Sequence, residues 1–216
     1  NTYADIELVK KLYSEAIGHP QVIGLVIGTR PDCISNDLID FLSELSNQYY
    51  ISLEIGVERT LDRTLKMVNR CHTFKESVAA LELSKNKGLH LGVHMIIGLP
   101  GESREDILNH AKEISKLPIN SLKLHHLQVV KHTMMATQLK EDQAMFNFFT
   151  IEEYVDLITE FGAILRPDII IERFSSQSPA NLLIAPNWNG LKNCEIVAKI
   201  DKKLGEKNLW QGKYHF

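Results

Sequence analysis

The sequence predicts an α/β fold built around a parallel sheet. Short apolar runs, typical of strands that are buried on both faces, alternate with longer segments whose apolar residues recur at helical spacing. Several helical segments begin at a Ser or Thr that is followed three residues later by an acidic residue, the pattern of a capping box. A repeated strand, helix, strand order favours parallel strands joined by right-handed crossovers. Because ligands bind at the carboxyl ends of such strands, the residues there are the first candidates for a site.

The first part of the chain supplies two strands and four helices. A continuous apolar run predicts the first strand, and Ser35 is expected to cap the helix that follows it. Thr60 is expected to cap a short helix, and Thr73-Phe74-Lys75-Glu76 forms a capping box. In order, these elements are a helix over residues 6–17, a strand over 22–28, a helix after 35, a strand over 51–57, a short helix over 60–70 and a helix over 73–88.

The stretch Leu89–Glu102, with the sequence LHLGVHMIIGLPGE, organises the centre of the chain. It begins as a strand and closes on Gly98-Leu99-Pro100-Gly101, which predicts a tight turn. Ser103-Arg104-Glu105-Asp106 then begins a helix with a capping-box pattern, and this helix is expected to reach Leu117. The turn therefore lies at the carboxyl end of the third predicted strand.

The rest of the chain continues the alternation and then loses it. Thr150-Ile151-Glu152-Glu153 is a further capping box. The predicted elements are a strand over 121–129, a connection over 131–149 without assigned structure, a helix over 150–165, a strand over 168–174, a loop over 175–190, a helix over 191–204 and a tail. We therefore predict a β/α part over residues 1–174 and a C-terminal loop, helix and tail over 175–216, packed on it.

Composition limits the classes of protein and partner. A net charge of -3, with 24 basic and 27 acidic residues, gives no global basic field for nucleic acid. The three cysteines are far apart and odd in number, which favours a reducing compartment over a disulfide framework. No apolar run approaches a membrane span and no signal-peptide pattern occurs, so we expect a cytoplasmic protein without a membrane partner. The start NTYAD lacks an initiator methionine, and we expect the chain to be a piece of a longer protein.

One face of the first three strands is unusual. Side chains alternate along a strand, so each strand divides into a helix-facing set and an inner set. The inner sets are Gly24, Val26, Gly28 and Arg30; Ser52, Glu54, Gly56 and Glu58; and His90, Gly92, His94 and Ile96. A closed barrel fills its interior with Val, Ile and Leu, whereas glycines and charges leave space and polar groups for a ligand. The alternative is that these charges pair with one another and the glycines only ease packing. The fourth strand does not divide cleanly.

Single motifs leave several functions open. The segment Gly98–Ser103 before a capped helix could bind an anion, although it lacks the Gly-Lys-Ser/Thr of a phosphate loop. No H-E-x-x-H, paired C-x-x-C or G-x-S-x-G occurs, which removes the common zinc and serine-hydrolase sites.

Four segments taken together resemble the radical S-adenosylmethionine (SAM) superfamily. They are GTRPD over 28–32, LEIGVE over 53–58, NRCHT over 69–73 and VHMIIGLPGE over 93–102. Their order and spacing are similar to those of the branch that contains the elongator catalytic subunit and the oxygen-independent coproporphyrinogen oxidases. The segment SPANLLIAPNWNGLKN over 178–193 resembles a set of uncharacterised bacterial members.

This resemblance implies a partial, six-stranded TIM-type (β/α) barrel, here truncated at its N-terminus to about five parallel strands with outer helices. It also implies two cofactors, SAM and a [4Fe-4S] cluster. An electron from the cluster cleaves SAM to methionine and a 5'-deoxyadenosyl radical, which takes hydrogen from the substrate. The implied electron donor is a flavodoxin or ferredoxin. The substrate stays open, with tRNA as one candidate because relatives in the wider group modify tRNA or tetrapyrroles.

The resemblance also assigns cofactor-binding positions. Glu58 matches a Gln that contacts SAM, and Arg70 matches an Arg whose guanidinium grips the SAM carboxylate with two parallel hydrogen bonds. His94 stands where the oxidases have an Asp that contacts the cofactor, and Arg30 replaces an acidic residue. The implied cofactor-binding set is Gly28, Thr29, Arg30, Glu54, Glu58, Arg70, His94 and Gly98.

The cluster ligands of the superfamily lie on a C-x-x-x-C-x-x-C loop after the first strand, upstream of every segment matched here. Cys33, Cys71 and Cys194 do not have this spacing, so we expect no metal ligand in this chain and no activity from it alone. Two alternatives remain. One is a cluster-free β/α-barrel lyase or phosphate-ester enzyme that binds an anion at the Gly98–Ser103 turn. The other is a non-catalytic scaffold that binds RNA through tail lysines, although acidic residues lie among them.

Overall fold

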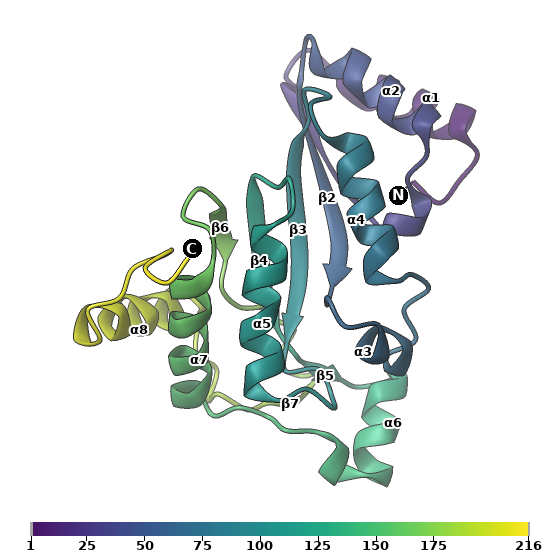
Figure 1. Ribbon diagram of the computed structural model, residues 1–216. Coiled ribbons are helices and arrows are strands. Elements are labelled where there is room, and N and C mark those ends of the chain that lie inside the picture. The colour runs from purple at the N-terminus through teal and green to yellow at the C-terminus, as the bar shows by residue number, and fades with distance from the viewer. Residues whose placement is uncertain (1, 216) are drawn as a thin grey trace. The chain divides into compact units, whose positions relative to one another are not determined.

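Five parallel strands form one sheet, in the order β1-β2-β3-β4-β6, and confirm the predicted α/β class (Figure 1). The computed structural model describes residues 2–215. The strands of this sheet are β1 (Gly24–Thr29), β2 (Tyr50–Glu58), β3 (His90–Ile97), β4 (Ser121–His126) and β6 (Ile170–Arg173). Two shorter strands, β5 (Val129–Val130) and β7 (Leu183–Ala185), pair antiparallel in a second sheet.

Helices occupy most of the segments between the strands. They are α1 (Ile6–Ile17), α2 (Asn36–Ser46), α3 (Asp62–Met67), α4 (Phe74–Ser84), α5 (Arg104–Ser115), α6 (Met134–Glu141), α7 (Ile151–Ile164) and α8 (Asn193–Glu206), with short 3-10 helices η1 (Pro31–Cys33) and η2 (Gln143–Met145). Among the described residues, no helix combines the length and the apolar character that a membrane span requires.

The chain divides into two compact units. The first unit comprises the chain up to His94 together with Leu117–Leu122, and the second comprises Met95–Lys116 and the chain from Lys123 onward. This division follows spatial contacts and does not test the boundary predicted at residue 174, which stays a prediction.

In the first unit, β1 and β2 pair in a register that places Gly28 opposite Glu54. Helices α2 and α4 contact β2. The predicted helix-facing side chains of β2, which are Leu53, Ile55 and Val57, are fully buried. Ser35 caps α2 by accepting a hydrogen bond from the Leu38 N–H, as predicted. Alternation along β2 and local capping therefore set both the sheet face and the helix positions.

The short helix after β2 begins later than predicted. Leu61, in an extended conformation with φ -111° and ψ 113°, is its N-cap, and α3 starts at Asp62. The prediction that Thr60 caps this helix is therefore wrong. The reason is local, because an N-cap must directly precede the first residue with helical dihedral angles, and here that residue is Asp62.

The second unit is held together by contacts of α7 with α5 and with α8. Tyr154, Leu157, Ile158 and Phe161 form the buried face of α7. The predicted capping boxes are present: Ser103 with Asp106 begins α5, and Thr150 with Glu153 begins α7. On the outer side, Arg104 and Lys207 form ion pairs with Asp156 and Glu160.

The fourth strand is shorter than predicted. The apolar run over 121–129 does not form one strand, because β4 ends at His126 and Val129–Val130 pairs with β7 instead. Residue Leu127 connects them and donates its N–H to the Ile97 carbonyl at 2.8 Å. The connection over 131–149 contains α6 and η2, and the loop over 175–190 contains β7. The end of β4 and the position of β5 are therefore set by pairing between segments that lie far apart in the sequence.

Candidate cofactor site

Two polar side chains from adjacent strands of the first unit meet on the inner face of the sheet. His94 on β3 and Glu54 on β2 lie 2.7 Å apart, measured from Nε2 to Oε2. The Glu54 side chain is 10% exposed and that of His94 is 28% exposed, so solvent reaches the histidine more than the acid. The strand alternation that placed both on one face is therefore confirmed for this pair.

An ion pair lies at the end of β2. The Arg70 guanidinium, which follows α3, donates to Glu58 Oε1 at 2.9 Å and to the Gly56 carbonyl at 3.2 Å. Burial raises the pKa of the Glu58 carboxyl by more than the charges of Arg70, His94 and Arg59 lower it. The pKa of Glu58 therefore lies above its usual value. Glu58 also has a φ of 61°, a left-handed conformation that non-glycine residues rarely adopt. The carboxyl is thus held in a strained, desolvated position.

Arg70 keeps a donor available in this pair. Its Nε is buried and has no hydrogen-bond partner within residues 2–215. A guanidinium presents its N–H groups in a planar fork, and a carboxylate can accept from two of them at once. The guanidinium therefore keeps one donor without an acceptor among the described residues, which is compatible with a carboxylate-bearing ligand such as SAM.

Two glycines of the inner face differ in the space around them. A Cβ at Gly56 would lie 2.9 Å from Glu58 Oε1 and 3.0 Å from an Arg70 nitrogen, so this glycine lets the ion pair approach the strand. A Cβ at Gly28 would meet nothing within 4 Å, so the space beside β1 is open. The open space next to Gly28 could therefore hold part of a ligand, and Glu54 is the residue paired with Gly28 on the adjacent strand.

Thr29 and Arg30 extend from the end of β1. Thr29 Oγ1 forms a short hydrogen bond with Thr2 Oγ1. The Arg30 guanidinium makes two hydrogen bonds to Asp32, at 3.0 and 2.6 Å, and lies over the Tyr3 ring. Burial raises the pKa of the Asp32 carboxyl, but the hydrogen bonds and charge of Arg30 together lower it by more. The pKa of Asp32 therefore lies below its usual value. Arg30 is thus paired with Asp32, which sequence reasoning did not anticipate.

Gly98 belongs to the second unit, as part of the turn before α5. Its φ is +89° and that of Gly101 is +78°, so both positions favour glycine. A Cβ at Gly98 would also crowd the Phe149 ring at 3.2 Å. The described contacts thus explain Gly98 by turn geometry, and its predicted cofactor role stays a prediction.

The same turn is a poor anion site. Asp106 Oδ2 accepts hydrogen bonds from the Ser103 N–H at 2.9 Å and from the Ser103 hydroxyl at 3.0 Å. The carboxylate of the capping box therefore already supplies negative charge at the start of α5. This contact disfavours the alternative of an anion-binding enzyme at the Gly98–Ser103 segment.

Several residues near the site were missed by sequence reasoning. Arg59 directly follows Glu58 and is fully buried, which is rare for arginine. His72 Nε2 lies 3.4 Å from the Val57 carbonyl, and burial lowers the pKa of its imidazole. Its position in the sequence could have indicated Arg59 as a site residue, because it directly follows a buried strand and a predicted site residue.

The residues described do not fit an iron–sulfur cluster. Within residues 2–215 no group of three or more His, Cys, Asp or Glu side chains could hold a metal ion. Cys33, Cys71 and Cys194 are free thiols. The described residues therefore include no ligand set for a cluster, and the predicted SAM-binding residues stay a prediction.

Two family models together match most of the chain. The model of the radical SAM superfamily matches residues 1–114, and that of the radical SAM C-terminal domain matches residues 119–206. The chain is 30% identical to YtqA of Bacillus subtilis, over 99% of this chain and 66% of YtqA. It is 25% identical to the tRNA uridine(34) acetyltransferase of Methanocaldococcus infernus, over 87% of this chain and 34% of that protein.

Among solved structures, Elp3 of Methanocaldococcus infernus, with an N-terminal deletion, has the same fold. Its TM-score is 0.75 at 24% identity, covering 88% of this chain and 43% of that chain. The chain thus spans about two thirds of YtqA and a smaller part of the tRNA-modifying relative. The predicted branch is confirmed, and the chain belongs to the radical SAM superfamily.

Proposed function

We propose that this chain forms the SAM-binding part of a radical SAM enzyme whose substrate is a tRNA. The observation that carries the first half of the proposal is the Arg70–Glu58 pair with the buried Arg70 Nε. Bound SAM, cleaved by one electron from a [4Fe-4S] cluster, would supply hydrogen-atom abstraction from the substrate. Membership of the superfamily supports this chemistry.

The residues of the first unit would bind and orient the cofactor. Arg70 would grip the carboxylate of SAM, and Glu58 would keep the guanidinium in place through the 2.9 Å hydrogen bond. The open space beside Gly28 would accept part of the cofactor, next to Glu54 and its partner His94. Thr29 and Arg30 would border this space from the end of β1.

Two partners lie outside this chain in the proposal. The cluster cysteines would come from another segment of the same protein, because the described residues hold no metal-ligand group. The electron would come from a flavodoxin or a ferredoxin. A tRNA substrate is supported by the relative that is named a tRNA uridine(34) acetyltransferase, which is 25% identical to this chain.

The test is SAM affinity in the full-length protein with its cluster reconstituted. Calorimetric titration should show weaker binding of SAM by Arg70→Ala, by about 10- to 100-fold, because a hydrogen bond between charged groups contributes about 1.5–3 kcal/mol. Arg70→Lys should recover only part of this loss, since an ammonium cannot form the planar fork.

Lys66→Ala is the matched control, because Lys66 is an exposed cation on the neighbouring helix α3. It removes the same charge and should leave SAM affinity unchanged. Equal affinities of wild-type protein and Arg70→Ala would contradict the role of Arg70 in holding the carboxylate.

A further inference from the structure

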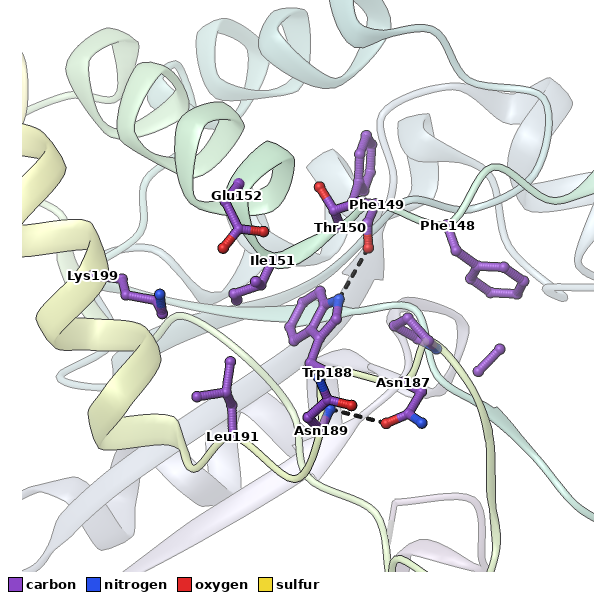
Figure 2. A pocket seen from close by; sticks show the side chains of 12 residues that line it. Phe148, Phe149, Thr150, Ile151, Glu152, Asn187, Trp188, Asn189, Leu191 and Lys199 are labelled. Carbon is purple, nitrogen blue, oxygen red and sulfur yellow. Dashed lines mark hydrogen bonds between the residues drawn. The ribbon is translucent and has the colours of Figure 1, made fainter.

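A cavity lies entirely within the second unit, and none of the predicted cofactor-binding residues lines it. Its volume is about 660 Å³, and Figure 2 shows it from close by. The residues that give it its chemistry are Trp188, Phe148, Phe149, Ile151, Leu191 and Asn187. We call it the aromatic cavity. It lies between the segment that leads into α7 and the loop that precedes α8.

Trp188 is held rigidly in the wall of this cavity. Its indole Nε1–H donates to the Phe149 carbonyl at 3.0 Å, the dashed line at the centre of Figure 2. Its ring stacks on His126 with centroids 4.1 Å apart and also contacts the Tyr154 ring at 5.0 Å. A ring fixed from three sides loses little conformational entropy when a ligand packs against it.

The stack on Trp188 is electrically neutral. Burial, assisted by the nearby charge of His125, lowers the pKa of His126 to about 4. His126 therefore carries no charge near neutral pH and contacts Trp188 as an uncharged ring. The Ser176 N–H also donates to its Nδ1, at 3.3 Å.

The edge of the cavity carries amides and charges. Asn187 Oδ1 accepts a hydrogen bond from the Asn189 N–H at 2.9 Å, which holds the two asparagines at one side (Figure 2). Glu152 from α7 and Lys199 from α8 lie at the other side. Such an edge suits a planar ring with hydrogen-bonding groups on its rim better than an aliphatic ligand, because amides recognise base edges by paired hydrogen bonds.

Lysines continue from the cavity along α8. Lys199 also borders a neighbouring depression, which is lined by Lys202, Lys203, Glu152 and Glu206. Glu206 lies 3.8 Å from both Lys202 and Lys203, so this surface is only moderately cationic. A surface with this little positive charge suits a single RNA strand that contacts it through a few phosphates. It does not suit a duplex, whose binding depends on many phosphate contacts.

From these contacts we propose that the aromatic cavity binds one unpaired nucleobase of an RNA strand, whose adjacent phosphates lie along the lysines of α8. The base would pack against Trp188 and Ile151, and an asparagine amide would read its edge. This inference rests on the RNA half of the proposed function and assigns the place where the strand is held. It does not depend on how SAM binds.

Photo-crosslinking locates the base directly. The full-length protein is irradiated with a short single-stranded RNA that carries 5-iodouridine, and the crosslinked peptides are identified by mass spectrometry. The expected crosslinks fall in the peptides that contain Phe148, Phe149 or Trp188. Crosslinks that saturate with RNA but lie only elsewhere would overturn the assignment of the cavity while leaving an RNA substrate intact.

Fluorescence anisotropy of a labelled RNA tests the lysine path. Lys199→Glu should weaken binding about tenfold, because it replaces an attractive charge beside the strand by a repulsive one. The matched control is Lys140→Glu on α6, an exposed lysine that does not line the aromatic cavity, and it should leave the affinity unchanged. Equal weakening by both variants would overturn the proposed path.

The salt dependence of the affinity and competition by free nucleotide test the proposal further. The logarithm of the affinity should fall with the logarithm of salt concentration with a slope of about -1.4 to -2.1, as expected for two or three phosphates on a single strand. Free nucleotide that competes as strongly as the oligonucleotide would overturn the proposal of an RNA strand. Absence of RNA binding, with SAM binding intact, would also overturn it without touching the cofactor site.

Discussion

The two units contain buried or half-buried titratable groups of opposite character. In the first unit, Glu54, Glu58, Arg70 and His94 are charged or polar groups that pair beside open space at Gly28. In the second unit, the buried imidazole of His126 is kept neutral and packs between aromatic rings. Buried charges cost stability and become favourable when a ligand contacts them, whereas packed rings stabilise the fold itself. The comparison predicts that changes in the first cluster alter binding, and changes in the second alter stability.

The largest effect is expected for Trp188→Ala. This variant removes the ring contacts with His126 and Tyr154 and the hydrogen bond to the Phe149 carbonyl. The free energy of unfolding, measured by chemical denaturation, should fall by about 3–5 kcal/mol. Trp210→Ala is the matched control because Trp210 is 56% exposed, and it should cost less than about 1 kcal/mol. Similar losses for the two variants would break the comparison.

Acid should destabilise the protein through His126. Its pKa is about 4 in the folded state and about 6.5 in an unfolded chain, so the unfolded state binds the proton more tightly. The stabilisation from a neutral His126 is complete above pH 6.5 and is lost as the pH falls from 6.5 to 4. The loss attributable to this group is up to about 3 kcal/mol.

Denaturation curves at several pH values measure this dependence. His126→Gln cannot take up the proton, so its stability should change less than that of the wild-type protein between pH 6.5 and 4. Parallel profiles for the two proteins would mean that His126 does not titrate as its burial indicates.

The smallest change in stability is expected for Gly28→Ala. A Cβ at this position meets nothing within 4 Å, and alanine restricts the unfolded chain more than glycine. The free energy of unfolding should rise by less than about 1 kcal/mol. Affinity for SAM, measured by calorimetry on the full-length protein, should fall because the methyl group enters the space assigned to the cofactor.

Gly24→Ala provides the contrast on the same strand. A Cβ at Gly24 would lie 2.0 Å from the Tyr50 carbonyl oxygen, so this variant should disturb the pairing of β1 with β2 and lower stability. If Gly28→Ala binds SAM as well as the wild-type protein does, the cofactor does not use the space beside Gly28.

The features that the sequence predicted correctly depend on neighbours within a few residues. Capping boxes such as Thr73 with Glu76 join residues three apart, and strand alternation placed Leu53 and Glu54 on opposite faces. The features that it missed depend on distant partners. Residues 121–129 read as one strand, yet their last part pairs with β7, more than fifty positions later.

The candidate sites show the same limit. The family resemblance assigned Glu58 and Arg70 to one cofactor, but it predicted neither their ion pair with each other nor the pairing of Arg30 with Asp32. The sequence placed Trp188 only in the segment over 178–193 that resembles a set of uncharacterised family members. Its stack on His126 joins two segments that no periodicity connects, so sequence patterns carry no signal for the aromatic cavity.

The pairing of β5 with β7 has a consequence for how the polypeptide could be cut. These strands, together with the Lys131 N–H bond to the Leu182 carbonyl, clasp the two ends of a segment that contains α6, α7 and β6. A single nick in the chain over 175–182 would therefore leave both fragments joined by the clasp and by the contacts of α7 with α8. The C-terminal piece that carries Trp188 would stay in place as a non-covalent partner of the rest of the unit.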